Sequence, residues 1–231
     1  MNRILVCFLI VLNLQAVAQH LQVHYDFGED RQYVTSTLEM FRPTDTGAWF
    51  WFVDFDYDSE KGSANLAYWE IARYFTLPVW DNKLSAKLEY NDGVVIGEIR
   101  ENNQNVGYWG APLHNVWLTG LSYPINLAGF TLQTELLFRY MQVSDAPDWQ
   151  FTFVWMHDWF EGRMVFSGYL DLWSQDLAGD KKWILQTEPQ LWYMATSQLG
   201  LGGEVEISRN FLPQFGSEVK LMPTLGVKWI F

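Results

Sequence analysis

Apolar and polar residues alternate along most of this chain, in segments separated by turn-rich gaps. In Gly47–Asp58, every second residue from Trp49 to Tyr57 is apolar. Asp54 and Asp56 lie at the alternate positions, on the other face of the same segment. A period of two is the pattern of a β-strand with one apolar and one polar face. The pattern recurs down to the C-terminus, so the sequence predicts an all-β protein.

The segments predict an antiparallel, up-and-down series of about twelve strands, and bacterial outer-membrane barrels have even strand numbers. The predicted strands are 21–27, 32–42, 47–57, 65–76, 83–91, 107–122, 130–142, 149–158, 163–174, 182–194, 199–209 and 218–231. The one long connection, Asp92–Val106, is rich in Asn, Gly and Glu. We expect it to be an external loop and the segment best placed to plug a barrel. The connections at the opposite end are short, namely Arg42–Thr46, Phe160–Gly162 and Ala195–Gln198.

Large aromatic residues favour a membrane barrel over a soluble secreted β-sandwich, which would also show alternation. They lie near the ends of the apolar faces, as in the aromatic girdles of lipid-facing barrels. They are Trp49, Tyr57, Tyr90, Tyr140, Trp149, Trp159, Trp183, Tyr193 and Trp229. The last strand ends in Trp229-Ile230-Phe231, which resembles the signal that the barrel-assembly machinery of outer membranes recognises. We therefore predict a closed transmembrane barrel, because lipid offers no partners to an open sheet edge.

The N-terminus has the three parts of a secretory signal. Arg3 supplies the positive charge, Ile4–Leu14 the apolar stretch and Ala16-Val17-Ala18 the small-residue cleavage site. The sequence therefore predicts a signal peptide over 1–18 and an outer-membrane barrel over 19–231. The only cysteine, Cys7, would leave with the signal peptide, so disulfide and thiol chemistry are not expected in the mature chain.

Composition narrows the range of partners. The chain of 231 residues has a net charge of −12, which leaves no basic surface for a nucleic acid. Aromatic residues make up 17% of the chain, and such a composition argues against disorder. The mean hydropathy is −0.09, and no apolar run beyond the signal approaches the roughly 20 residues of a helical membrane span. Strands would therefore have to cross the membrane.

The polar faces of the strands would line the interior of such a barrel. By alternation, the inward acidic residues are Glu39, Asp54, Asp56, Glu70, Glu89, Glu135, Asp158, Asp171, Glu188, Glu204, Glu206 and Glu218. The inward basic residues are fewer, namely Lys87, Arg139, Arg163, Lys220 and Lys228. Buried charges need partners or water, so we expect a hydrated lumen. Its net negative field would disfavour anions and admit neutral or cationic solutes.

Four segments carry a family resemblance: Thr37–Phe41, Trp51–Tyr57, Tyr68–Ile71 and Phe166–Asp176. They resemble the Tsx-like nucleoside-specific channel-forming outer-membrane proteins, and more closely an uncharacterised β-barrel branch of that family than its founding channel. The resemblance covers most of Tyr25–Phe231. It implies a monomeric barrel with a narrow, aromatic-lined pore for nucleosides. The loops of this chain are shorter than the family pattern, which bears on the substrate more than on the fold.

The chemistry of a nucleoside fits one group of inward residues. Aromatic side chains stack on the face of a base, and carboxylates accept hydrogen bonds from sugar hydroxyls. The candidate substrate-binding residues are Phe50, Phe52, Asp54, Asp56, Tyr68, Glu70, Tyr169, Asp171 and Trp173. The alternative is that each of these rings only packs the lumen.

Motifs for catalysis or metal binding are incomplete. Asp54-x-Asp56-x-Asp58 begins like a calcium loop, but Ser59 and Asn65 stand where its glycine and bidentate glutamate belong. The 4 histidines lack metal-binding spacing, and no P-loop or serine-hydrolase motif occurs. We therefore predict no catalytic residue, no metal ligand and no cofactor.

Taken together, these features predict a passive channel for small neutral solutes, with nucleosides as the favoured class, in a monomer surrounded by outer-membrane lipid. Two alternatives stay open. One is a plugged structural or adhesive barrel without transport. The other is a barrel lipid hydrolase, which would need an activatable serine.

Overall fold

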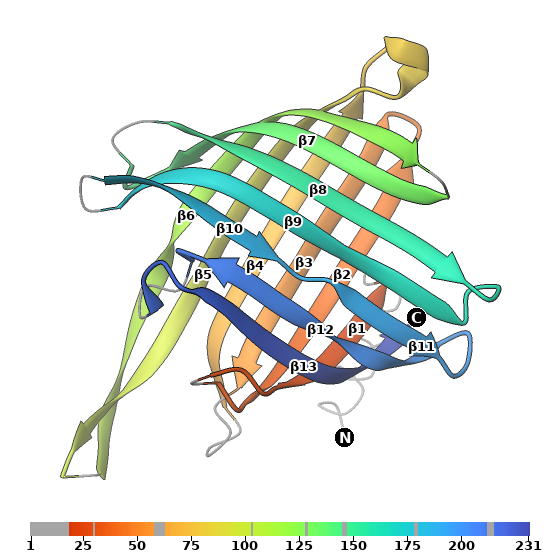
Figure 1. The fold of residues 1–231 in the computed structure, drawn as a ribbon. Coiled ribbons are helices and arrows are strands. Elements are labelled where there is room, and N and C mark those ends of the chain that lie inside the picture. The colour runs from red at the N-terminus through yellow and green to blue at the C-terminus, as the bar shows by residue number, and fades with distance from the viewer. Residues whose placement is uncertain are drawn as a thin grey trace, which may run out of the picture.

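The computed structural model describes residues 19–29, 31–57, 63–102, 104–127, 129–144, 147–177, 180–211 and 215–231. The predicted signal peptide lies outside these ranges. The described residues form one antiparallel sheet that closes into a barrel, because β1 pairs with β13 (Figure 1). No helix in this part of the chain is long and apolar enough to cross a membrane.

The strands are β1 (His20–Asp26), β2 (Val34–Thr44), β3 (Gly47–Tyr57), β4 (Ala64–Thr76), β5 (Ser85–Glu101), β6 (Gln104–Leu127), β7 (Phe130–Met141), β8 (Asp148–Trp159), β9 (Met164–Leu177), β10 (Asp180–Thr187), β11 (Gln190–Met194), β12 (Leu199–Arg209) and β13 (Val219–Ile230). A short 3-10 helix, η1 (Trp80–Asn82), lies between β4 and β5. β10 and β11 share one position in the wall, since each pairs with β9 on one side and with β12 on the other. Pro189 separates them and has no N–H to donate to the sheet. The wall therefore has twelve strand positions, and the predicted barrel is confirmed.

The predicted external loop, Asp92–Val106, is instead part of a long hairpin. β5 and β6 stay paired from Ile96–Gly110 to Glu101–Gln104, beyond the last pairs that either strand makes with β4 or β7. Figure 1 shows this ribbon projecting away from the barrel, at the end far from the C-terminus. The loop prediction is therefore wrong, and so is the prediction that this segment plugs the lumen.

The outer face of the wall is apolar. Leu136 pairs with Leu121 on one side and Phe151 on the other, and all three side chains are exposed. The predicted girdle residues also point outward, with Trp49, Tyr140, Trp149, Trp159, Trp183, Tyr193 and Trp229 exposed. The buried polar residues lie on the opposite face. This apolar exterior around a polar interior is that of a bacterial outer-membrane barrel, with aromatic residues at the lipid interfaces.

The two ends of the barrel differ in their connections. The end that holds the C-terminus has short turns, such as Asp45-Thr46 and Ala195–Gln198, and one longer connection, Leu77–Leu84, which contains η1. The opposite end carries the β5–β6 ribbon and the connections 27–33 and 210–218. Short turns are periplasmic and longer loops extracellular in barrels of this type. We therefore call the two ends the periplasmic end and the outer end.

Candidate functional site

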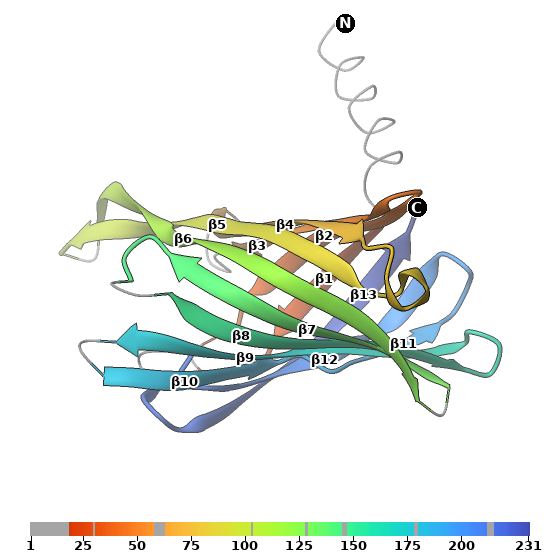
Figure 2. The same ribbon diagram turned by 90° about the horizontal axis from the view of Figure 1, so that it is seen from above.

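The predicted substrate-binding residues all lie on inward positions of the wall. Between β3 and β4, Phe52 pairs with Glu70 and Asp54 pairs with Tyr68. Tyr169, Asp171 and Trp173 alternate along one face of β9, and Asp171 pairs with the buried Thr152 of β8. Figure 2 shows β3 and β4 in the wall opposite β8 and β9. The inward direction of these residues is confirmed, whereas their role in binding stays a prediction.

Three rings form a line on β3 and β4. The ring centroids of Phe50 and Phe52 are 5.9 Å apart, and those of Phe52 and Tyr68 are also 5.9 Å apart. The Tyr68 hydroxyl donates to Glu70 Oε1 at 2.6 Å. Asn91 Nδ2 donates to the same oxygen at 3.1 Å. Ring faces and a carboxylate acceptor therefore lie next to each other on this wall.

The residues of β9 are engaged differently. Thr152 donates to Asp171 Oδ1 at 2.5 Å. Trp173 is only 6% exposed, and the Arg139 guanidinium lies over its ring at 5.3 Å from the centroid. Because a cation already covers this ring, Trp173 packs the lumen more than it offers a free stacking surface.

The carboxylates of the two walls meet in the middle of the lumen. Glu70 and Asp171 repel each other across it, and so do Asp54 and Glu204. Asp56 also repels Asp54, and it interacts in addition with Arg31 towards the outer end. Arg139 interacts electrostatically with both Glu70 and Asp171, so a cation accompanies these carboxylates, and the net negative field stays a prediction.

A cluster around Lys87 was not predicted as a unit, although its charged members were predicted to face inward. Lys87 Nζ lies 2.5 Å from Glu89 Oε2 and 2.6 Å from Glu135 Oε2. Tyr74 Oη and Ser122 Oγ each donate to Glu135 Oε1 at 2.9 Å. The cluster joins β4, β5, β6 and β7. Contacts between strands that are not neighbours depend on the curvature of the wall. Alternation predicts only which face a residue lies on, so it could not predict this cluster.

A second cluster, around Arg31, was missed altogether. Arg31 lies in the connection between β1 and β2, and its guanidinium pairs with Asp26 of β1 and Glu206 of β12. Two other predictions of inward residues are wrong. Arg163 lies exposed in the β8–β9 turn, and Glu218 precedes β13 with its side chain 72% exposed. Alternation fails at these positions because they lie outside the strands.

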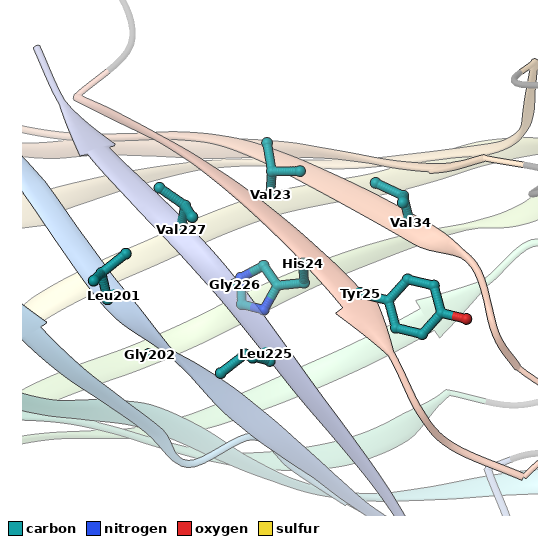
Figure 3. A pocket seen from close by; sticks show the side chains of 9 residues that line it. All are labelled: Val23, His24, Tyr25, Val34, Leu201, Gly202, Leu225, Gly226 and Val227. Carbon is teal, nitrogen blue, oxygen red and sulfur yellow. The ribbon is translucent and has the colours of Figure 1, made fainter.

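An open surface hollow lies on the lipid-facing side of the wall, between β1, β12 and β13 (Figure 3). It has a volume of about 520 Å³ and is lined mainly by Val23, Tyr25, Val34, Leu201, Leu225 and Val227. Gly202 and Gly226 leave space between these side chains. Because its lining is apolar and faces lipid, the hollow is not a site for a polar solute in the lumen.

His24 lies behind this hollow and does not form a catalytic triad. Its Nδ1 is 2.7 Å from Thr224 Oγ1 and 3.7 Å from Glu204 Oε1. A hydrolase triad uses one ring nitrogen for the nucleophile and the other for the acid. At His24 both partners face the same nitrogen, so this grouping gives no support to hydrolase chemistry.

Comparison with known proteins places the fold among porins. The NanC porin superposes with a TM-score of 0.56 at 12% sequence identity, over 93% of this chain and 100% of that one. The KdgM porin gives a TM-score of 0.50 at 10% identity, over 93% of this chain and 99% of that one. No curated protein matches the sequence. The profile of a family described as "Domain of unknown function (DUF5020)" matches residues 18–231.

Proposed function

We propose that this chain, which belongs to the family described as "Domain of unknown function (DUF5020)", is a passive outer-membrane channel for small neutral solutes, with nucleosides as its substrate class. The porin-like fold supports the channel. The line of rings from Phe50 to Tyr68, which ends at Glu70, carries the choice of nucleosides.

The proposed binding mode follows from the geometry of β3 and β4. A base would stack on the face of Phe52 or Tyr68, because every base has a flat π-face that can stack on an aromatic ring. The ribose hydroxyls would donate to Glu70 or Asp54, because a carboxylate has acceptor positions beyond those its protein donors use. Asp171 on the opposite wall would strengthen the negative field and oppose the entry of phosphorylated solutes.

Nucleosides are expected to block the current through the channel. Purified protein in a planar bilayer should show discrete current steps, which adenosine and thymidine reduce with saturation and ribose does not. Phe52→Ala should weaken this block about fivefold to a hundredfold, since one stacked base contributes about 1–3 kcal/mol. Phe55→Ala, on the lipid-facing side of the same strand, is the matched control and should leave the block unchanged.

Two outcomes of this recording would contradict the nucleoside assignment. A current that adenosine, thymidine and ribose all leave unchanged would indicate a pore without specificity for nucleosides. Equal block by ribose would mean that the site recognises the sugar, so that the rings only pack the lumen.

The second candidate is a plugged structural barrel without transport. It is favoured by the Lys87 cluster, which joins the neighbouring strands β4 to β7 on the inner face of the wall, with the Glu135 side chain 0% exposed. For this candidate, correctly folded protein would pass no current. Folding can be followed independently by the heat-dependent gel mobility of the barrel.

A further inference from the structure

The connection between β1 and β2 folds into the outer end of the lumen. Phe27 N donates to Pro223 O of β13 at 2.9 Å, which ties the start of the connection to the neighbouring strand. Gly28 is buried, and its N–H donates to Asp26 Oδ1 at 2.7 Å. A side chain at Gly28 would collide with the thioether of Met222, an inward residue that is 0% exposed. The backbone at residue 28 therefore lies against the inner surface of β13.

Arg31 fixes this connection to two parts of the wall. Its Nη1 donates to Asp26 Oδ2 at 3.0 Å, and its Nη2 donates to Glu206 Oε2 at 2.8 Å. Asp26 lies on β1 and Glu206 on β12, so the guanidinium reaches across the inner surface of β13. The side chain of Asp26 is 2% exposed and that of Glu206 is 9% exposed, against 20% for Arg31. The guanidinium is therefore the most accessible member of the cluster.

Further groups face Arg31 at the same end. Tyr33, later in the connection, hydrogen-bonds to Asp56 of β3, and Asp56 interacts electrostatically with Arg31. The connection thus places the Arg31 cation among carboxylates of β1, β3 and β12, while Glu29 of the same connection pairs with Lys220 of β13. A solute that enters from the outer end meets this charge before the carboxylates in the middle of the lumen.

We propose that Arg31 determines the conductance and charge selectivity of the channel, by holding its guanidinium between Asp26 and Glu206 at the outer end of the lumen. The proposal rests on the proposed function, because it concerns how the channel selects solutes. Two physical effects follow from it. The guanidinium occupies space in the entrance, and its charge partly cancels the field of Asp26, Asp56 and Glu206.

Arg31→Ala is expected to raise the single-channel conductance and to shift selectivity towards cations. One unit charge at about 4 Å in water changes the occupancy of a monovalent ion about fivefold. Removal of the Arg31 charge favours potassium by this factor and disfavours chloride by the same factor. The potassium-to-chloride permeability ratio, measured as a reversal potential across a salt gradient, should therefore rise about 25-fold. Arg31→Lys should preserve much of the charge effect, although lysine cannot reproduce both contacts of the guanidinium.

Arg209→Ala is the matched control. Arg209 lies at the outer end of β12, exposed, and donates to Ser217 O at 3.2 Å instead of to a lumen carboxylate. The variant removes the same charge from the same end of the barrel. Because Arg209 donates to Ser217 O instead of to a lumen carboxylate, we expect the conductance and the reversal potential to stay unchanged. An equal effect of the two variants would overturn the proposal, because the charge would then act without its place in the lumen.

A second experiment avoids the risk that Arg31→Ala misfolds. It restores a charge at position 31 by chemical modification of a folded variant. Cys7 is the only cysteine and is expected to leave with the signal peptide, so Arg31→Cys would supply a single thiol that can be modified with a cationic or an anionic reagent. The cationic adduct should lower conductance and cation preference, and the anionic adduct should raise cation preference. Identical currents before and after both modifications would overturn the role of Arg31.

The outcomes also separate this proposal from the proposed channel. If the unsubstituted protein conducts and the Arg31 variants conduct identically, the channel stands and the role of Arg31 fails. If only the Arg31 variants conduct, the Arg31 side chain blocks the passage, so its role is supported and the proposed channel of the unsubstituted protein fails. If correctly folded protein is silent in every form, both proposals fail.

Discussion

Lys87→Met is expected to lower the free energy of unfolding by about 3–5 kcal/mol, the cost of removing one partner from a buried ion pair. Lys87 is 6% exposed and lies between Glu89 and Glu135, whose side chains are 4% and 0% exposed. Methionine would fill similar space but would leave two carboxylates without their cation. Unfolding by urea in lipid vesicles, followed by tryptophan fluorescence and gel mobility, measures the change.

Two further variants show whether this cost comes from the unpaired carboxylates. Lys220→Met removes a cation whose own side chain is 16% exposed but whose partners Glu29 and Glu218 have side chains that are 63% and 72% exposed. Exposed pairs are worth about 0–1 kcal/mol, so this control should lose little. Adding Glu135→Gln to Lys87→Met should recover part of the loss, because glutamine keeps an acceptor for Tyr74 and Ser122. A loss no larger than that of Lys220→Met would contradict the buried ion pair.

The two ionic clusters lie on different parts of the inner wall. The Lys87 cluster connects β4 to β7, and the Arg31 cluster connects β1 and β12 at the outer end. The rings of Phe52 and Tyr68 lie on the wall between β1 and β5. A solute would therefore pass the Arg31 cluster to reach the rings. This order links the selectivity proposed for Arg31 to the binding proposed for the rings.

Much of the fold could be predicted from alternation because lipid and water impose opposite requirements on the two faces of each strand. The predicted strand 47–57 coincides with β3, and 199–209 coincides with β12. The predicted strand 182–194 is one position in the wall, but it is interrupted at Pro189, which cannot donate to the sheet.

The β5–β6 ribbon could not be predicted in the same way. Outside the membrane both faces of a ribbon are wet, so the apolar and polar alternation that marks the other strands is lost. Glycines and asparagines in this segment then resemble a loop. In the structure, the Trp109 ring lies over Gly97, a contact between two strands that only the hairpin register creates.

Alternation gave the inward direction of the candidate site but not its contacts. Phe52, Tyr68 and Trp173 all face the lumen, yet only the structure shows that Arg139 covers Trp173. The two-residue alternation could not identify Arg31, because Arg31 lies in a connection between strands where apolar and polar residues do not alternate. Its contacts with Asp26 and Glu206 form because β1 and β12, from opposite ends of the sequence, lie on either side of β13.

Leu136→Arg is expected to cost about 2–4 kcal/mol of folding stability, because an arginine at the bilayer midplane of a barrel's lipid face must be desolvated. Leu136 is 44% exposed in the middle of β7, between the exposed Leu121 and Phe151. Surface exposure of this kind would make the substitution nearly neutral in a soluble protein. The measurement therefore tests the environment of the outer face as well as the strand register.

Tyr140→Arg is the matched control, on the same face of the same strand but near its outer end. An arginine near the interface costs about 0–1 kcal/mol, since its long side chain reaches the headgroups. Reversible unfolding in thin-lipid vesicles should therefore give a difference of about 1–4 kcal/mol between the two variants. Equal and small costs would mean that Leu136 faces water, and the apolar outer face would then have to be covered by something other than lipid.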